Sequence, residues 1–269
     1  MDLSSLALPW PGEPAAIVSA WRDGEWRTLA SCGDLSEVRA WASVTKLVSA
    51  LAVAIDVDQG RASLDNPLGP PGSTLAHLLS HSSGLGLEEG DRVHAPGLRR
   101  IYSNYGIDLA AERLARTDVA SWLEERVTAP LSMNTTRLVG RASEGLIGST
   151  QDLGTLACQW ARPTLISTQR RDDAVSPFLP GLDGVVPGFG RFTPCPWGLG
   201  VEIRGDKQHW MGDWPRASFG HFGRSGALAL VDVAAALCLV ATSTVDFGPW
   251  ARELWPTWTS NVRAMARAS

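Results

Sequence analysis

The chain has 269 residues, of which 44% are hydrophobic and 19% are charged, an ordinary composition for a globular protein with a substantial core. Its formal net charge is −4 and it contains no stripe of basic residues, which argues against nucleic acid as a partner. The longest apolar stretch, 227–241, is interrupted by Asp232 and is too short to span a bilayer, so we expect no membrane-spanning segment.

The N-terminal sequence MDLSSLALPWPGEP has neither the positive charge nor the long apolar run of a secretory signal peptide. The four cysteines, Cys32, Cys158, Cys195 and Cys238, are far apart in the sequence and form no C-x-x-C pair. We therefore expect a cytoplasmic location with reduced thiols, and not a disulfide framework or a zinc site.

The N-terminal region predicts a hairpin followed by a buried helix. Strands are expected over 15–21 and 26–30, on either side of an Asp-Gly pair that favours a tight turn. A helix is predicted to begin at about Ser43, and Gly60 suits its end. Because this helix is apolar on nearly every face, we expect it at the centre of the protein.

The middle of the chain is predicted to be mostly helical and the C-terminal part mostly β. The expected helices lie near 74–80, within 107–129 with a break near 117–118, and over 149–161, capped by Ser149 or Thr150. The Pro- and Gly-rich stretch 177–196 is expected to be a long loop or crossover. After it the apolar period changes to two, which predicts strands over 197–204, 217–222, 226–231 and 236–242. Pro249 can begin a final helix, with an interruption expected at Pro256.

This order of elements predicts an α+β fold. An antiparallel sheet formed from both chain ends and flanked by helices would carry an inserted, mostly helical region. We expect residues 1–269 to form a single unit, with 1–60 and 190–269 in the sheet region and 61–189 in the helical insertion.

Lysine is scarce, since only Lys46 and Lys207 among the 24 Lys and Arg residues are lysines. A buried lysine can lose its proton near neutral pH, whereas an arginine cannot. A lysine in a chain that otherwise uses arginine therefore indicates a position where a neutral amine is needed. Lys46 follows Ser43 by three residues, which puts both side chains on one face of a helix. A lysine with a pKa of about 7–8 can activate a serine hydroxyl as a nucleophile. The alternative is a helix-capping serine followed by a surface lysine.

Tyr102 and Asn104 lie two residues apart in a polar segment just before the helix expected from 107. Both side chains can face one cavity if this segment is extended. A phenol beside a lysine can relay protons, and an amide can hold a substrate or orient the lysine. The alternative is a tyrosine packed on the core and an asparagine that caps the next helix.

His221 and Gly223 come at the end of a predicted strand, with Arg224 directly after them. A glycine lets a substrate backbone lie close to a strand edge. The backbone N–H of Arg224 can act together with that of Ser43 as an oxyanion donor. The alternative is a histidine that merely ends a strand.

These motifs follow one another as S-x-x-K, Y-x-N and H-x-G, and in this order the chain resembles the serine β-lactamase and penicillin-binding-protein superfamily. It is most similar to the class C-like branch, which includes D-alanyl-D-alanine carboxypeptidases and β-lactamase-like esterases. Further segments resemble connecting segments of that branch: 64–68, 78–85, 96–97, 130–133, 149–153 and 197–200.

The resemblance implies a role for each matching residue. Ser43 would be acylated, and Lys46 and Tyr102 would share the acid and base work. Asn104 would contact the substrate or Lys46, and His221 would take the place of the family's strand lysine and add electrostatic help. Water would then hydrolyse the acyl-enzyme without any cofactor.

Two departures from the family pattern bear on the substrate. Many relatives have Thr or Ser where this chain has Phe222, and that hydroxyl helps to hold a substrate carboxylate. The chain is also shorter than typical relatives, notably between Gly33 and Ser43 and within the helical region. We therefore expect hydrolysis of small esters or amides, with weak or no β-lactamase activity.

Other functions remain open at this point. His77 and His81 are four residues apart, but they lack the glutamate of an H-E-x-x-H motif, so we expect no metal. The chain could be a catalytically silent ligand-binding or scaffold protein that keeps the fold, or it could transfer the acyl group to an alcohol or amine. The natural substrate, the oligomeric state and the choice between Lys46 and Tyr102 as the acylation base stay open.

Overall fold

A computed structural model describes residues 10–116 and 118–268 and has a six-stranded antiparallel sheet at its centre, in the order β2-β1-β11-β10-β9-β8. The strands are β1 (Ala15–Arg22), β2 (Glu25–Cys32), β8 (Glu202–Ile203), β9 (Phe219–Phe222), β10 (Leu228–Asp232) and β11 (Leu237–Thr242). Because β1 pairs with β11 along six residue pairs, the prediction of a sheet formed from both chain ends is confirmed.

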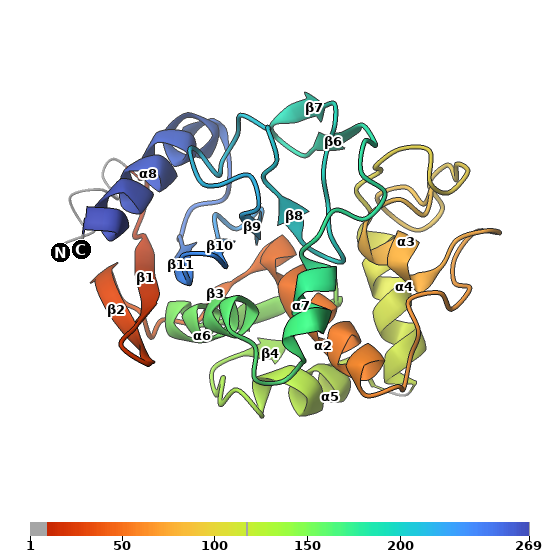
Figure 1. The fold of residues 1–269 in the computed structure, drawn as a ribbon, viewed down its shortest axis with the longest axis horizontal. Coiled ribbons are helices and arrows are strands. Elements are labelled where there is room, and N and C mark those ends of the chain that lie inside the picture. The colour runs from red at the N-terminus through yellow and green to blue at the C-terminus, as the bar shows by residue number, and fades with distance from the viewer. Residues whose placement is uncertain (1–9, 117, 269) are drawn as a thin grey trace.

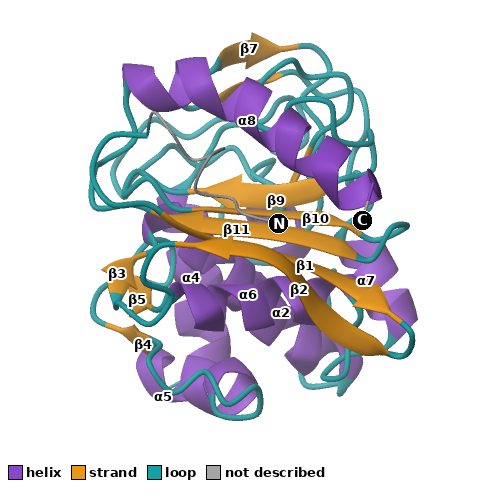
Figure 2. Ribbon diagram, turned by 90° about the vertical axis from the view of Figure 1, so that its left-hand side faces the viewer, coloured by secondary structure: helices purple, strands orange, loops and turns teal. Residues whose placement is uncertain are grey.

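Helices cover both faces of this sheet (Figure 2). Helix α8 (Pro249–Ala268) lies over one face, and α6 (Thr150–Ala161) and α2 (Thr45–Asp58) lie over the other. Successive residues of β11 alternate between the two cores, so that Leu239 packs on the α8 side and Val240 on the α6 side. Burial on both faces makes β10 and β11 nearly continuous apolar runs, in place of the two-residue apolar period expected from the sequence.

Helix α2 is the predicted buried helix, and it runs through the middle of the molecule (Figure 1). Its residues 45–56 are all buried, and Gly60 follows its end with a φ of +71°, which a glycine adopts without strain. The chain enters α2 through a 3₁₀ turn, η1 (Ala42–Val44). Ser43 therefore lies in the turn just before the α-helix.

The mostly helical middle of the chain is confirmed. It contains α3 (Leu75–Leu79), α4 (Asn104–Ala115), α5 (Val119–Leu123), the π-helical turn η2 (Glu124–Thr128) and α7 (Thr168–Ala174), with short strands β3 (Arg39–Ala40), β4 (Arg137–Leu138) and β5 (Leu146–Gly148) beside them. Ser149 caps α6 by accepting a hydrogen bond from the backbone of Asp152, as expected. Of the predicted break at 117–118, Thr117 lies outside the described residues, and Asp118 caps α5.

Three sequence expectations need correction. The expected loop 177–196 contains a small hairpin, β6 (Gly184–Val186) and β7 (Gly190–Phe192). The strand expected over 197–204 is reduced to the two residues of β8. The interruption expected at Pro256 is absent, because α8 continues through it and buries Trp255 and Trp258 on either side. Burial of these indoles outweighs the one backbone hydrogen bond that a proline cannot donate.

Within residues 10–116 and 118–268, no helix combines the length and apolar character that crossing a membrane requires. Residues 1–9 carry most of the segment on which the expectation about a signal peptide rests, and they lie outside the described residues.

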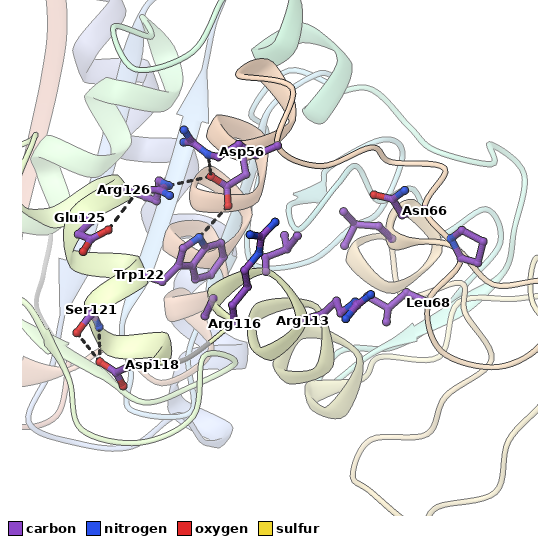
Figure 3. Close-up of a pocket in the computed structure, with 15 residues that line it drawn as sticks. Asp56, Asn66, Leu68, Arg113, Arg116, Asp118, Ser121, Trp122, Glu125 and Arg126 are labelled. Atoms are coloured by element: carbon purple, nitrogen blue, oxygen red, sulfur yellow. Dashed lines mark hydrogen bonds and ion pairs between the residues drawn. The ribbon is translucent and has the colours of Figure 1, made fainter.

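The far end of α2 is fixed by a buried carboxylate. Asp56 is 3% exposed and accepts hydrogen bonds from Trp122 Nε1 (2.9 Å), Arg126 Nε (2.8 Å) and Arg61 Nε (2.7 Å). The contacts to Trp122 and Arg126 tie α2 to α5 and η2 (Figure 3). Although burial opposes it, these hydrogen bonds hold the pKa of Asp56 below its ordinary value.

We expect Asp56→Ala to lower the free energy of unfolding by about 2–3 kcal/mol, because it leaves a buried indole N–H and two guanidinium groups without their acceptor. Urea denaturation followed by circular dichroism measures the change. Asp65→Ala is the matched control, since Asp65 is exposed and its loss should change stability by less than about 0.5 kcal/mol. Equal effects of the two substitutions would show that the Asp56 contacts do not stabilise α2.

Candidate active site

Lys46 lies inside the protein, at the start of α2, with its side chain surrounded by polar groups from other elements. It is 0% exposed. Its Nζ donates to Asn104 Oδ1 (2.7 Å) and to the backbone oxygen of Ser143 (2.9 Å), and lies 3.5 Å from Ser43 Oγ. The structure thus brings the predicted nucleophile, the predicted base and the predicted amide together.

Burial lowers the pKa of Lys46 to about 7, although the nearby Asp108 carboxylate opposes this shift. A neutral amine has two N–H groups and one lone pair. Asn104 and Ser143 accept the two N–H groups, which leaves the lone pair on the side of Ser43. Near neutral pH this arrangement can take the proton of the serine hydroxyl.

Tyr102 closes the other side of Ser43. Its side chain hydrogen-bonds to Ser43, and Lys46 Nζ lies 4.7 Å from the centre of its ring. The ring packs between His81 and Trp197, with centroid distances of 4.7 and 5.9 Å. Burial raises the pKa of Tyr102 well above its ordinary value, so the side chain is a neutral phenol that can donate a proton.

The end of β9 reaches the serine through a contact that only a glycine permits. A Cβ at Gly223 would lie 2.3 Å from the backbone oxygen of Trp41, so the strand and the turn before Ser43 pack backbone against backbone. Within the described residues, neither the Ser43 N–H nor the Arg224 N–H has a protein acceptor, and both residues line one cavity. Two backbone donors without acceptors beside one cavity are what an oxyanion hole requires. Ala42, with a φ of +45°, holds the turn in a strained conformation.

His221 is buried beside Tyr102, with a ring-centroid distance of 5.9 Å. Burial and the neighbouring Lys46 charge lower the pKa of His221 to about 3, so the imidazole is neutral near pH 7. Its Nδ1 donates to the backbone oxygen of Phe222 (2.7 Å), while its Nε2 has no protein partner among the described residues. His221 therefore supplies a hydrogen-bond acceptor to the cavity, in place of the positive charge that a lysine would supply.

A cavity of about 250 Å³ opens in front of Ser43, and we call it the catalytic cavity. Its walls are mostly apolar or aromatic, formed by Val186, Pro187, Gly188, Trp197, Phe222 and Phe247 beside the catalytic side chains and Glu202. Despite the opposing effect of burial, the Lys207 ammonium at 2.8 Å holds the pKa of Glu202 well below its ordinary value. Lys207 thus neutralises the carboxylate in the cavity wall, and the other oxygen of Glu202 accepts from Trp210 Nε1 (2.9 Å).

Several supporting residues were not predicted. Asp108 accepts from the backbone N–H of Ser143 (2.8 Å) and fixes the carbonyl that holds Lys46. Its place four residues after Asn104, one helical turn away, was a usable signal. Glu88 accepts from Asn104 Nδ2 (2.9 Å) and fixes the orientation of that amide. Ser143 and Glu88 lie in loops whose paths brought them to Lys46 and Asn104, and no sequence pattern predicted these contacts.

Comparisons with known proteins identify the family. The family model described as Beta-lactamase matches residues 11–260. The D-alanyl-D-alanine-carboxypeptidase/endopeptidase AmpH of Escherichia coli K12 is 29% identical over 42% of this chain and 43% of its own length, so the match spans less than half of that relative.

Solved structures extend the likeness to the whole fold. The crystal structure of a beta-lactamase from Mycobacterium bovis is 42% identical, with a TM-score of 0.92 over 97% of this chain and 98% of that chain. EstCE1, a hydrolase with promiscuous acyltransferase activity, shares the fold at 14% identity, with a TM-score of 0.74 over 96% of each chain. The family model covers nearly the whole sequence and the expected superfamily is confirmed, so the chain belongs to the beta-lactamase family of hydrolases.

Proposed function

We propose that the protein is a serine hydrolase that forms an acyl-enzyme on Ser43 and hydrolyses small, uncharged acyl esters. The observation that carries this proposal is the environment of Lys46, a fully buried amine with a pKa of about 7. Its two N–H groups donate to Asn104 and Ser143, and its lone pair is left on the side of Ser43 Oγ. A scaffold that only binds a ligand has no use for a lysine held in this form.

In the acylation step, Lys46 takes the hydroxyl proton as Ser43 Oγ attacks the carbonyl carbon. The carbonyl oxygen becomes an oxyanion, which the N–H groups of Ser43 and Arg224 stabilise. The tetrahedral intermediate then collapses and breaks the bond to the leaving alcohol. The proton on Lys46 reaches the leaving oxygen through the neutral phenol of Tyr102, which hydrogen-bonds to Ser43.

Deacylation repeats these steps with water. Lys46 is neutral again and removes a proton from a water molecule that attacks the acyl carbon. Collapse of the second intermediate returns that proton to Ser43 Oγ and releases the carboxylic acid. An alcohol in place of water would give acyl transfer from the same acyl-enzyme.

The catalytic cavity favours an uncharged acyl group. His221 is neutral, and Phe222 is turned into the aromatic core and offers no hydroxyl for a substrate carboxylate. Glu202 is paired with Lys207 and adds no net charge to the wall. These features disfavour a β-lactam or a peptide C-terminus, both of which carry a carboxylate close to the reacting carbonyl.

The nucleophile is tested by intact-protein mass spectrometry after treatment with a fluorophosphonate. We expect one adduct on the wild type and on Ser176→Ala, an exposed serine used as the matched control, and none on Ser43→Ala. Loss of folding would be detected by circular dichroism of each variant. Absence of an adduct on the folded wild type would overturn the proposal and favour a non-catalytic binding protein.

The base is tested by the pH dependence of acylation. Below pH 7 Lys46 is protonated and has no lone pair, so the burst rate with p-nitrophenyl butyrate should rise through about pH 7 and then level off. Lys46→Arg should lower this rate by about 10²–10⁴-fold, because an arginine stays protonated.

A second variant assigns the midpoint of this profile to Lys46. The Asp108 charge raises the pKa of Lys46, so Asp108→Asn should move the midpoint to lower pH. Stopped-flow measurement of the burst phase gives the midpoint for each variant. A midpoint that stays in place in Asp108→Asn would contradict the assignment to Lys46.

The substrate class is tested by comparing kcat/KM for p-nitrophenyl butyrate and for a cephalosporin. We expect the ester to be preferred by at least about tenfold, since neutral His221 and Phe222 offer a substrate carboxylate neither a positive charge nor a hydroxyl, and a carboxylate left unpaired there loses more than about 1.4 kcal/mol. Faster turnover of the cephalosporin would show that the protein is a true β-lactamase.

A further inference from the structure

A second depression adjoins the catalytic cavity, and we call it the outer groove. It has a volume of about 340 Å³ and shares Tyr102 and Pro187 with the catalytic cavity. One wall comes from the segment before Tyr102 and the other from the β6–β7 hairpin, which are joined by a hydrogen bond from Arg100 N to Asp183 O (2.8 Å). A substrate held at Ser43 can therefore extend past Tyr102 into this groove.

The side of the scissile bond that enters the groove follows from the chemistry. The proton released by Ser43 must reach the leaving oxygen, and Tyr102 is the neutral phenol placed to deliver it. The leaving alcohol therefore lies against Tyr102. Because Tyr102 also lines the outer groove, the groove holds the remainder of that alcohol.

The charge of the outer groove differs from that of the catalytic cavity. Arg191 is paired with Asp183, and buried Arg100 donates to backbone oxygens of Ser80, Cys195, Phe178 and Leu179. Arg99 is exposed and has no carboxylate partner among the described residues. The groove is lined by three guanidinium groups and one carboxylate, which makes it net positive.

The Arg99 guanidinium is held in place without being neutralised. Its Nη2 donates to His94 Nδ1 (3.1 Å). Desolvation and nearby arginines lower the pKa of His94, so the imidazole is neutral and its Nδ1 can accept this hydrogen bond. The groove also exposes two large apolar side chains, Leu87 (46% exposed) and Val185 (53% exposed). An occupant with both an apolar ring or chain and a carboxylate would match these surfaces.

We propose that the natural substrate is an ester whose leaving alcohol carries a carboxylate, which Arg99 binds in the outer groove while the uncharged acyl group fills the catalytic cavity. This inference rests on the proposed ester hydrolysis at Ser43. Cleavage follows the steps given above: the Ser43 Oγ–acyl bond forms, the acyl–alcohol bond breaks, and the alcohol leaves with its carboxylate unchanged and its oxygen protonated through Tyr102.

The test uses two substrates with the same acyl group, 4-carboxyphenyl butyrate and 4-carbamoylphenyl butyrate. The ratio of their kcat/KM values isolates the effect of the leaving-group charge, and comparing the ratio between variants cancels the difference in leaving-group reactivity. We expect Arg99→Ala to lower this ratio by about three- to fivefold, the range of an exposed charge pair, through KM and not through kcat. Arg99→Lys should restore part of the loss.

Arg113→Ala is the matched control, since Arg113 is an exposed arginine that lines a different pocket (Figure 3). It should leave the ratio unchanged. Adding 150 mM salt shortens the Debye length to about 8 Å and screens the exposed Arg99 charge, so it should lower the wild-type ratio. An equal fall for both substrates in Arg99→Ala, or an unchanged ratio, would overturn the proposal while leaving ester hydrolysis intact.

Binding gives a readout that does not depend on turnover. Calorimetry with the Ser43→Ala protein should show tighter binding of 4-hydroxybenzoate than of 4-hydroxybenzamide, and Arg99→Ala should remove the difference. If the wild type hydrolyses neither ester but this binding preference is present, the proposed function fails and the anion site stands. Equal binding of the two phenols would overturn the anion site.

Discussion

The burial of Lys46 is the constraint on which the rest of the site depends. An ammonium group removed from water is costly unless its N–H groups find acceptors. Asn104 at the start of α4 and the Ser143 carbonyl supply them, so two segments distant in sequence must converge on the first turn of α2. Incomplete compensation leaves the pKa of Lys46 near 7, so the desolvation that costs stability also suits Lys46 to the proposed role of base.

The oxyanion donors depend on a second constraint, the close approach of β9 to the turn before Ser43. Gly223 leaves no room for a side chain against Trp41, and this contact joins the C-terminal sheet to the N-terminal end of the central helix. The sheet itself closes through the pairing of β1 with β11. The proposed hydrolase therefore needs both ends of the chain in place before Ser43 and Arg224 can act together.

Charge divides the cleft into two parts around Tyr102. On the side of the catalytic cavity, neutral His221 and the Glu202–Lys207 ion pair carry no net charge. On the side of the outer groove, Arg99 lacks a carboxylate partner among the described residues and favours an anion. In the proposed reaction, this division gives the two halves of a substrate different chemical requirements and would orient the substrate with its acyl group toward the core.

The hairpin, the buried helix, the C-terminal strands and the S-x-x-K, Y-x-N and H-x-G motifs could be predicted from the sequence, because each of these depends on residues close together in the chain. The surroundings of those motifs became visible only in the folded protein. The neutral state of His221, the second acceptor of Lys46 at Ser143, and the continuation of α8 through Pro256 all arise from burial against segments far away in sequence. Desolvation and packing are properties of the assembled core, so no local pattern could have revealed them.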